Sequence, residues 1–194
     1  MDEVADLPKR PFALLGLGEM GIGNSAIAAL LACVFAGISP EEAVGPGTGV
    51  QGKALSHKIE IVKAVLDRHR PDPSDPVGVL ASVGGAEFGA MAGAMLAGAS
   101  RGWAILVDGY IAGAAALLAI ALDPKVKDFL VWSHRSAEPG AKRLLEKLEI
   151  EPVLDFNLRL GEGTGAALAV PILRSACAVM RDMATFSGAG VSKG

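Results

Sequence analysis

The sequence predicts an α/β protein in which a parallel sheet carries helices on both faces. Two patterns support this fold class: short apolar runs alternate with longer, alanine-rich runs, and nearly every short run ends in a cluster of glycine or polar residues. Such alternation is typical of βαβ units, whose strands are buried on both faces. The chain of 194 residues fits one domain of ordinary size.

The first half of the chain is predicted to form, in order, a strand over residues 12–17, a helix over 24–36, a helix over 59–68, a strand over 77–83 and a helix over 87–99. A glycine-rich turn joins the first strand to the first helix. Ile59, Val62 and Leu66 recur at helical spacing, which predicts the second helix. The proline-rich residues 70–76 predict a surface loop, and the short apolar run after them predicts the second strand.

The second half is predicted to form a strand over residues 104–107, a helix over 111–122, a strand over 129–132, a helix over 137–149 and a last helix over 164–180. Residues 102–122 are apolar enough for a membrane span to be considered. Asp108 and Tyr110 interrupt this run and Gly109 marks a turn, so we expect a buried strand, a turn and a helix instead. Pro171 is expected to kink the last helix.

The composition narrows the class of partner and the compartment. Hydrophobic residues make up 51% of the chain and the mean hydropathy is +0.42. The first six residues are acidic where a secretory signal would be basic, so we expect a cytoplasmic protein. A formal net charge of -3, one tyrosine and two tryptophans do not fit a nucleic-acid-binding surface, which needs positive charge and aromatic rings for stacking on bases.

The cysteines and histidines predict neither a redox pair nor a metal site. Cys33 and Cys177 lie in apolar helical contexts, far apart and without a CxxC pattern, and are expected to be small buried residues in a reducing compartment. His57, His69 and His134 show no metal-ligand spacing with one another or with cysteine. We expect no metal and no cofactor.

Glycine and polar clusters follow most of the predicted strands and are expected to form the ligand site. They span residues 16–24, 82–85, 108–109 and 133–140. Ligands of open parallel sheets bind outside the carboxyl ends of the strands, where helix N-termini favour an anion such as a phosphate. Residues 45–49, with Lys58 nearby in sequence, predict a second anion site. The glycines of residues 16–23 do not match the usual dinucleotide fingerprint, and no Walker lysine is present.

One carboxylate, Glu162, stands among three glycines at the predicted start of the last helix. The apolar residues 166–173 that follow are expected to keep water away from this carboxylate and so to raise its basicity, as a general base requires. The alternative is that Glu162 only complements the positive end of the helix dipole. The local sequence leaves both interpretations open.

Six motifs together resemble one family closely, the nicotinate-nucleotide:dimethylbenzimidazole phosphoribosyltransferases. They lie, in the family's order, at residues 18–24, 47–49 with Lys58, 84–87, 107–111, 136–140 and 160–166. The resemblance implies a Rossmann-like parallel sheet and a homodimer. It also implies transfer of phosphoribosyl from nicotinate mononucleotide to 5,6-dimethylbenzimidazole, giving α-ribazole 5'-phosphate and nicotinate, in the lower-ligand branch of cobalamin biosynthesis.

The resemblance also implies roles for individual residues. Glu162 would be the catalytic base, and Leu160 would lie beside the acceptor ring. The residues expected to contact phosphate, ribose or the rest of the nucleotide are Glu19, Gly21, Gly47, Thr48, Gly49, Lys58, Gly84, Gly85, Ser136 and Gly140. Asp108 is expected to line the site while capping the helix that follows it, as an aspartate after a strand commonly does.

The sequence departs from the family in length and at single positions. Family members are nearly twice as long, and the N-terminal part that supplies the helices of a smaller domain has no counterpart here. Pro46 stands where a basic residue is expected, and Ala141 replaces a histidine. Three interpretations remain open: a fragment, a chain whose partner supplies the missing part, and a shortened homologue that binds nucleotides without catalysis.

Overall fold

Every pair of described strands is parallel, as predicted from the sequence, and the strands form a three-stranded and a two-stranded sheet. The computed structural model describes residues 14–185 and 187–190. Strands β1 (Leu14–Leu17), β2 (Ala104–Val107) and β3 (Leu130–Trp132) pair in the order β1-β2-β3, and β4 (His134–Ser136) pairs with β5 (Leu154–Leu158). Ser133 joins the two groups, because its N–H donates to the Val107 carbonyl and its carbonyl accepts from the Leu154 N–H. The α/β fold class is therefore confirmed.

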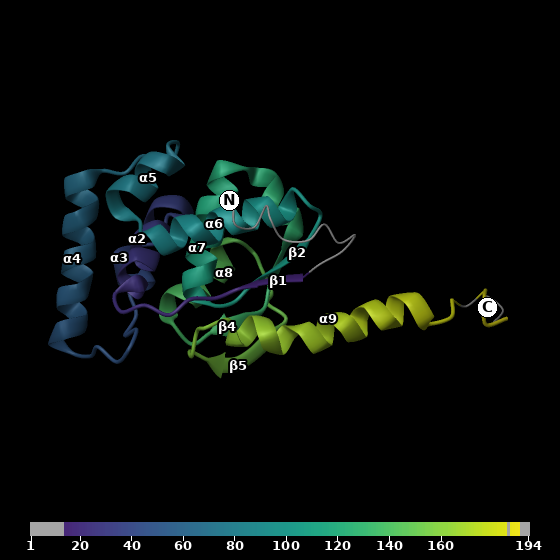
Figure 1. The fold of residues 1–194 in the computed structure, drawn as a ribbon. Helices are drawn as coiled ribbons and strands as arrows, with labels where there is room; N and C mark the ends of the chain where they lie inside the picture. The colour runs from purple at the N-terminus through teal and green to yellow at the C-terminus, as the bar shows by residue number, and fades with distance from the viewer. Residues whose placement is uncertain (1–13, 186, 191–194) are drawn as a thin grey trace.

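Helices cover both faces of this sheet (Figure 1). The helices are α2 (Asn24–Ala36), α3 (Pro40–Ala43), α4 (Lys53–His69), α5 (Pro76–Val83), α6 (Ala86–Ala99), α7 (Tyr110–Leu122), the 3-10 helix η1 (Pro124–Phe129), α8 (Pro139–Lys147) and α9 (Thr164–Asp182). Side chains of β2 alternate between the faces. Ile105 and Val107 join the main core with α2, α6 and α7, whereas Leu106 packs against Ala166 and Ala169 of α9.

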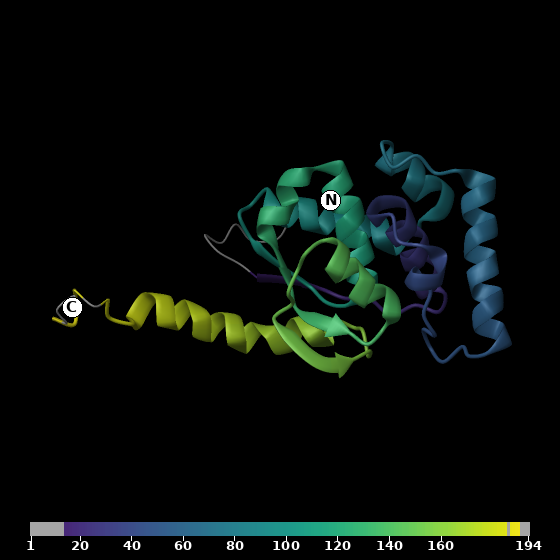
Figure 2. The ribbon, with the colours of Figure 1, turned by 180° about the vertical axis from the view of Figure 1, so that it is seen from behind.

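Helix α9 is in contact with the sheet only near its beginning and then runs away from the rest of the described fold (Figures 1 and 2). Leu168, Ile172 and Met180 are among its exposed side chains. Cys177 is also exposed there, so the expectation that both cysteines are buried is wrong for Cys177. No described helix is long and apolar enough to cross a bilayer.

The predicted strand over residues 77–83 is wrong, because these residues form helix α5. Asp75 occupies the N-cap and accepts a hydrogen bond from the Gly78 N–H, and Pro76 follows at the first helical position. Both are helix-start signals. An apolar run of this length fits a buried strand as well as one side of a short helix, and here Val79 and Val83 enter the core from the helix.

Other differences concern element boundaries and short strands. Helix α4 begins at Lys53, six residues before the predicted start at residue 59, and α8 is shorter than the predicted 137–149. Strands β4 and β5 and helix α3 are not predicted from the sequence. Helix α9 continues through Pro171 to Asp182. Residues 12 and 13 of the predicted first strand lie outside the described residues.

Candidate active site

A cavity of about 410 Å³ opens at the carboxyl ends of the strands. Its walls come from residues 18–25 after β1, residues 108–112 after β2, β4 with the start of α8, and residues 159–161 after β5; Gly47 and Thr48 close one side. Segments far apart in sequence therefore meet where the sequence predicts the ligand edge. Carboxyl ends of parallel strands are the usual ligand-binding edge of such sheets.

A lysine stands behind one part of the cavity wall. The Lys58 ammonium donates to the Ser25 hydroxyl at 2.9 Å and to the Gly45 carbonyl at 2.8 Å. Burial lowers the pKa of Lys58 from its ordinary value, and the negative charge of Glu138 acts in the opposite direction. Gly47 has a φ of 56°, and a Cβ there would lie 2.6 Å from the Ser25 oxygen, so this turn requires glycine.

The start of α8 is fixed against two other elements. A Cβ on Gly140 would lie 2.3 Å from the Ala43 carbonyl oxygen and 2.4 Å from the Tyr110 hydroxyl. The Tyr110 hydroxyl itself donates to the Ala43 carbonyl at 2.7 Å. Ser136, buried at the end of β4, accepts from the Glu138 N–H through its hydroxyl oxygen at 3.4 Å. Gly140 therefore serves close packing behind the cavity, while Ser136 lines it.

Glu19 is a carboxylate within the cavity wall. Burial raises its pKa, opposed by a hydrogen bond from the Asn24 side chain and reinforced by the negative charges of Glu87 and Asp108. A carboxylate with a raised pKa in a cavity is a candidate for proton transfer. The structure thus presents a second acidic group besides Glu162 for the role of base.

Glu162 lies beside the cavity but is exposed to water. It follows Gly161, which lines the cavity, and its N–H donates to the Glu19 carbonyl at 3.0 Å. The prediction that residues 166–173 shield the Glu162 carboxylate from water is therefore wrong. Ala166 and Ala169 turn toward the sheet, and Leu168 and Ile172 face outward, so none of them covers the carboxylate.

The backbone at Glu162 adopts a left-handed conformation, with φ of 59° between 77° at Gly161 and 75° at Gly163. A non-glycine residue in this region costs about 1–2 kcal/mol. Such conformations persist where the surroundings impose them, often at functional sites. The first helical residue of α9 is Thr164 and the N-cap is Gly163, so Glu162 precedes the helix and its first turn holds no acidic residue.

Asp108 lines the cavity as expected, but the expectation that it caps the following helix is wrong. Its carboxylate accepts from the Gly163 N–H at 3.2 Å and from the Ala166 N–H at 3.1 Å, so it caps α9 instead of α7. His134 Nε2 lies 3.7 Å from Asp108 Oδ1, and both side chains are 3% exposed. Because the sheet brings residue 108 to residue 163, only the tertiary structure determines which helix this aspartate caps.

Replacing Asp108 by asparagine is expected to loosen the loop that carries Glu162. An asparagine oxygen accepts one of the two backbone N–H groups, while its NH₂ group opposes the other. A buried N–H group without a partner costs about 1–3 kcal/mol, and we expect the free energy of unfolding to fall by that amount. Amide exchange at Gly163 and Ala166, measured by NMR, should become faster.

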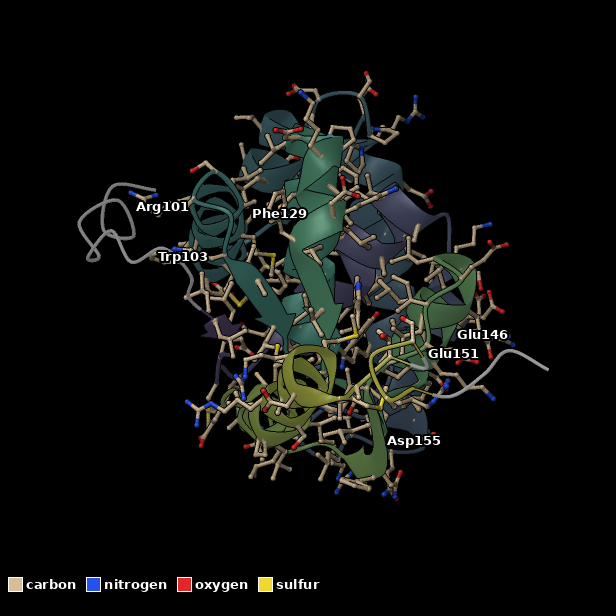
Figure 3. The ribbon with its side chains drawn as sticks, turned by 90° about the vertical axis from the view of Figure 1, so that its right-hand side faces the viewer. Arg101, Trp103, Phe129, Glu146, Glu151 and Asp155 are labelled. Carbon is tan, nitrogen blue, oxygen red and sulfur yellow. The ribbon has the colours of Figure 1, made fainter. Side chains whose placement is uncertain are left out.

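The matched control is Asp155→Asn. Asp155 is an exposed carboxylate on β5, at the outer edge of the fold, and pairs with Arg135 at 3.0 Å (Figure 3). This change should leave the exchange at Gly163 and Ala166 as it is. Unaltered exchange in Asp108→Asn would show that the aspartate does not hold the start of α9.

Most of the predicted site residues meet at the cavity, but four glycines do not line it. The cavity is lined by Glu19, Gly21, Gly47, Thr48, Asp108, Ser136 and Leu160. Lys58 stands one hydrogen bond behind the wall through Ser25, and Glu162 is next to Gly161. Gly49, Gly84, Gly85 and Gly140 are not among the lining residues. Gly84 and Gly85 join two helices, because the strand expected before them is α5.

Six lining residues with polar or charged side chains were not predicted as site residues: Asn24, Ser25, Tyr110, His134, Glu138 and Arg159. Asn24 and Glu138 lie within motifs that carry the resemblance, so their position in those motifs was the available signal. His134 was considered only as a metal ligand. In the part of the chain that the structure describes, no group of three or more His, Cys, Asp or Glu side chains could hold a metal ion.

Comparisons with known proteins agree with the resemblance. A family model described as phosphoribosyltransferase (DBI_PRT) matches residues 1–191. The nicotinate-nucleotide–dimethylbenzimidazole phosphoribosyltransferase of Desulforamulus reducens is 49% identical over 96% of this chain and 53% of its own length. The same-named protein of Ectopseudomonas mendocina is 49% identical over 91% of this chain and 50% of its own length.

A solved structure shares the fold. The crystal structure of CobT from Thermus thermophilus matches with a TM-score of 0.88 and 44% identity, over 100% of this chain and 56% of that one. The chain spans about half the length of the curated relatives it matches. Because the family model covers residues 1–191, the chain belongs to the DBI_PRT phosphoribosyltransferase family.

Proposed function

We propose that this chain takes part in the transfer of phosphoribosyl from nicotinate mononucleotide to 5,6-dimethylbenzimidazole. The products are α-ribazole 5'-phosphate and nicotinate, which places the reaction in the lower-ligand branch of cobalamin biosynthesis, in the cytoplasm. One observation carries the proposal: a single cavity has Gly47, Thr48 and the Lys58-bound Ser25 in its wall, Glu19 in another part of the wall, and Glu162 directly after the lining residue Gly161. The names of the relatives support the same reaction.

The reaction needs a base more than an acid. The pyridinium of nicotinate mononucleotide is already cationic, so the bond from its nitrogen to the anomeric carbon breaks with both electrons going to that nitrogen. One ring nitrogen of the benzimidazole forms the new bond to this carbon, and the proton on its other nitrogen must leave. The Glu162 carboxylate is proposed to accept that proton.

Phosphate and ribose positioning supplies much of the remaining rate. Attack from the face opposite the leaving group inverts the anomeric carbon from β to α, so the phosphate must stay anchored while the acceptor enters from the other side. Lys58, Gly47 and Thr48 are proposed to anchor it, with Ser136 at the end of β4. Holding the two reactants in line converts an encounter into an intramolecular step.

The acceptor side is open in the described chain. Met20, Ile22 and Leu160 line the cavity and are 73%, 91% and 67% exposed, and Glu162 beside them is exposed. We propose that a second polypeptide closes this side, either another copy in a homodimer or a partner chain that supplies the part of the relatives without a counterpart here. The exposure of Glu162 also supports the alternative function of a nucleotide-binding homologue without catalysis.

The test measures product from nicotinate mononucleotide and 5,6-dimethylbenzimidazole. The chain is assayed alone and with a polypeptide corresponding to the part of the Desulforamulus reducens relative that it does not match. We expect α-ribazole 5'-phosphate, detected by mass, at a higher rate in the second mixture, with co-elution of the two polypeptides in size-exclusion chromatography. Mononucleotide binding without product in both mixtures would exclude the transferase and support the binding homologue.

A further inference from the structure

An acidic side chain stands inside the predicted phosphate site. Glu138 lines the cavity, is half-buried and occupies the N-cap position of α8. Its Oε2 accepts from the Gly47 N–H at 3.4 Å. The same oxygen lies so close to Gly45 that a Cβ there would be 2.1 Å away from it. The carboxylate therefore rests against the glycine loop that the resemblance assigns to phosphate binding.

The groups around this carboxylate are those that an anion would use. Lys58 donates to the Gly45 carbonyl at 2.8 Å, so its ammonium is held on the same loop. The negative charge of Glu138 acts to raise the pKa of Lys58 against the larger effect of burial, which places the two charges within electrostatic reach. We call Ser25, Gly45, Gly47 and Lys58 the anion cradle.

We propose that Glu138 is a built-in competitor for the phosphate of the substrate, because its carboxylate accepts the Gly47 N–H that a phosphate oxygen would take, on the same loop that holds the Lys58 ammonium. This inference rests on the proposed function, which brings a phosphate to the cradle. Two negative groups a few ångströms apart repel each other, so phosphate binding requires the carboxylate to turn away. The half-exposed position of Glu138 leaves room for that rotation.

The competition makes Glu138 a residue that determines ligand specificity. A ligand with a single negative charge that displaces the Glu138 carboxylate only replaces one negative charge at the anion cradle by another, so its binding gains little free energy. A phosphate monoester brings a charge of about -1.5 to -2 and three strong acceptor oxygens. The cradle should therefore select phosphate esters over carboxylates and other monoanions, and removing the charge of Glu138 should weaken that selection.

The test is Glu138→Gln. Glutamine keeps a side-chain oxygen that accepts from the Gly47 N–H and keeps the volume, but it removes the charge. Calorimetry is run with nicotinate mononucleotide, with nicotinate riboside, which lacks the phosphate, and with inorganic phosphate. We expect affinity for the mononucleotide and for inorganic phosphate to rise about tenfold, as expected for removing one charge repulsion near the surface. Affinity for the riboside should stay the same.

Glu146→Gln is the matched control, with the same charge change on the same helix. Glu146 lies on the outer surface of α8 and pairs with Arg143 at 2.9 Å (Figure 3). It should change phosphate affinity less than about twofold, because screening by water and salt weakens exposed charges at a distance. Thermal unfolding of both variants confirms that each is folded.

Several outcomes would overturn the inference. Unchanged affinity for phosphate and mononucleotide in Glu138→Gln would exclude competition. Weaker binding of both riboside and mononucleotide would make Glu138 a ribose contact instead. If the mononucleotide fails to bind but the variant binds inorganic phosphate more tightly, the proposed function fails while this inference stands. Absence of phosphate binding by both proteins would exclude both.

Discussion

Glu162→Gln is expected to lower the rate of α-ribazole 5'-phosphate formation about 10²- to 10⁴-fold, the usual contribution of a positioned general base. Glutamine has the size and shape of glutamate, but its amide does not take up the benzimidazole proton at neutral pH. The KM for nicotinate mononucleotide should change little, because the phosphate is anchored at the other end of the cavity. Initial rates are measured in whichever mixture yields product in the assay proposed above.

The control is Glu151→Gln, which removes a carboxylate in the segment between α8 and β5, on the outer surface (Figure 3). Its rate should equal that of the unchanged chain. Glu19→Gln tests the competing assignment, in which Glu19 is the base. Burial raises the pKa of Glu19, and its side chain lies in the cavity wall. A large loss of rate in Glu19→Gln with an unaltered rate in Glu162→Gln would move the role of base to Glu19.

The prediction for Glu162 also shows what local sequence can establish. The three glycines correctly predict a turn directly before a helix, and Gly163 is indeed the N-cap of α9. Shielding from water is not a local property. It depends on what packs over residues 160–162, and the apolar residues nearest in sequence turn toward the sheet or outward from it.

The difference between local sequence patterns and burial by distant segments also explains which helices and strands could be predicted. Strand β2 was predicted with its observed bounds, because Ala104–Val107 is a continuous apolar run between a turn and a polar residue. Strand β5 was missed, since Leu154–Leu158 mixes apolar and polar residues and three of its five positions are exposed. Strands at the edge of a sheet need not show a buried pattern.

Among the site residues, Asp108 shows most clearly what local sequence does not predict. A strand followed by an aspartate, a glycine and a helix predicts a cap on that helix. The carboxylate instead satisfies two N–H groups of a helix that begins more than fifty residues later. Its partner depends on the parallel order of β2, β3 and β4 with β5, which no local pattern contains.

Lys58→Met is expected to weaken binding of nicotinate mononucleotide roughly 10- to 100-fold, the range for losing one charge-assisted hydrogen bond. Methionine keeps an unbranched apolar stem in the half-buried position but carries no charge. Binding of nicotinate riboside should change much less, because it lacks the phosphate. Lys58→Arg retains the positive charge and is the control. Equal loss of mononucleotide and riboside binding in Lys58→Met would indicate a general collapse of the site instead of a lost phosphate contact.

The lowered pKa of Lys58 gives the same residue a second, pH-dependent signature. Above this pKa and below the ordinary value of 10.5, the folded protein holds fewer protons at Lys58 than the unfolded chain does. The free energy of unfolding should therefore rise with pH across that window. Mononucleotide affinity should fall across the same window, because the ammonium that attracts the phosphate becomes neutral. Lys58→Arg should show neither trend, since arginine stays charged. Parallel pH profiles for the unchanged chain and Lys58→Arg, measured by calorimetry and denaturant unfolding, would contradict the assignment of Lys58 to phosphate.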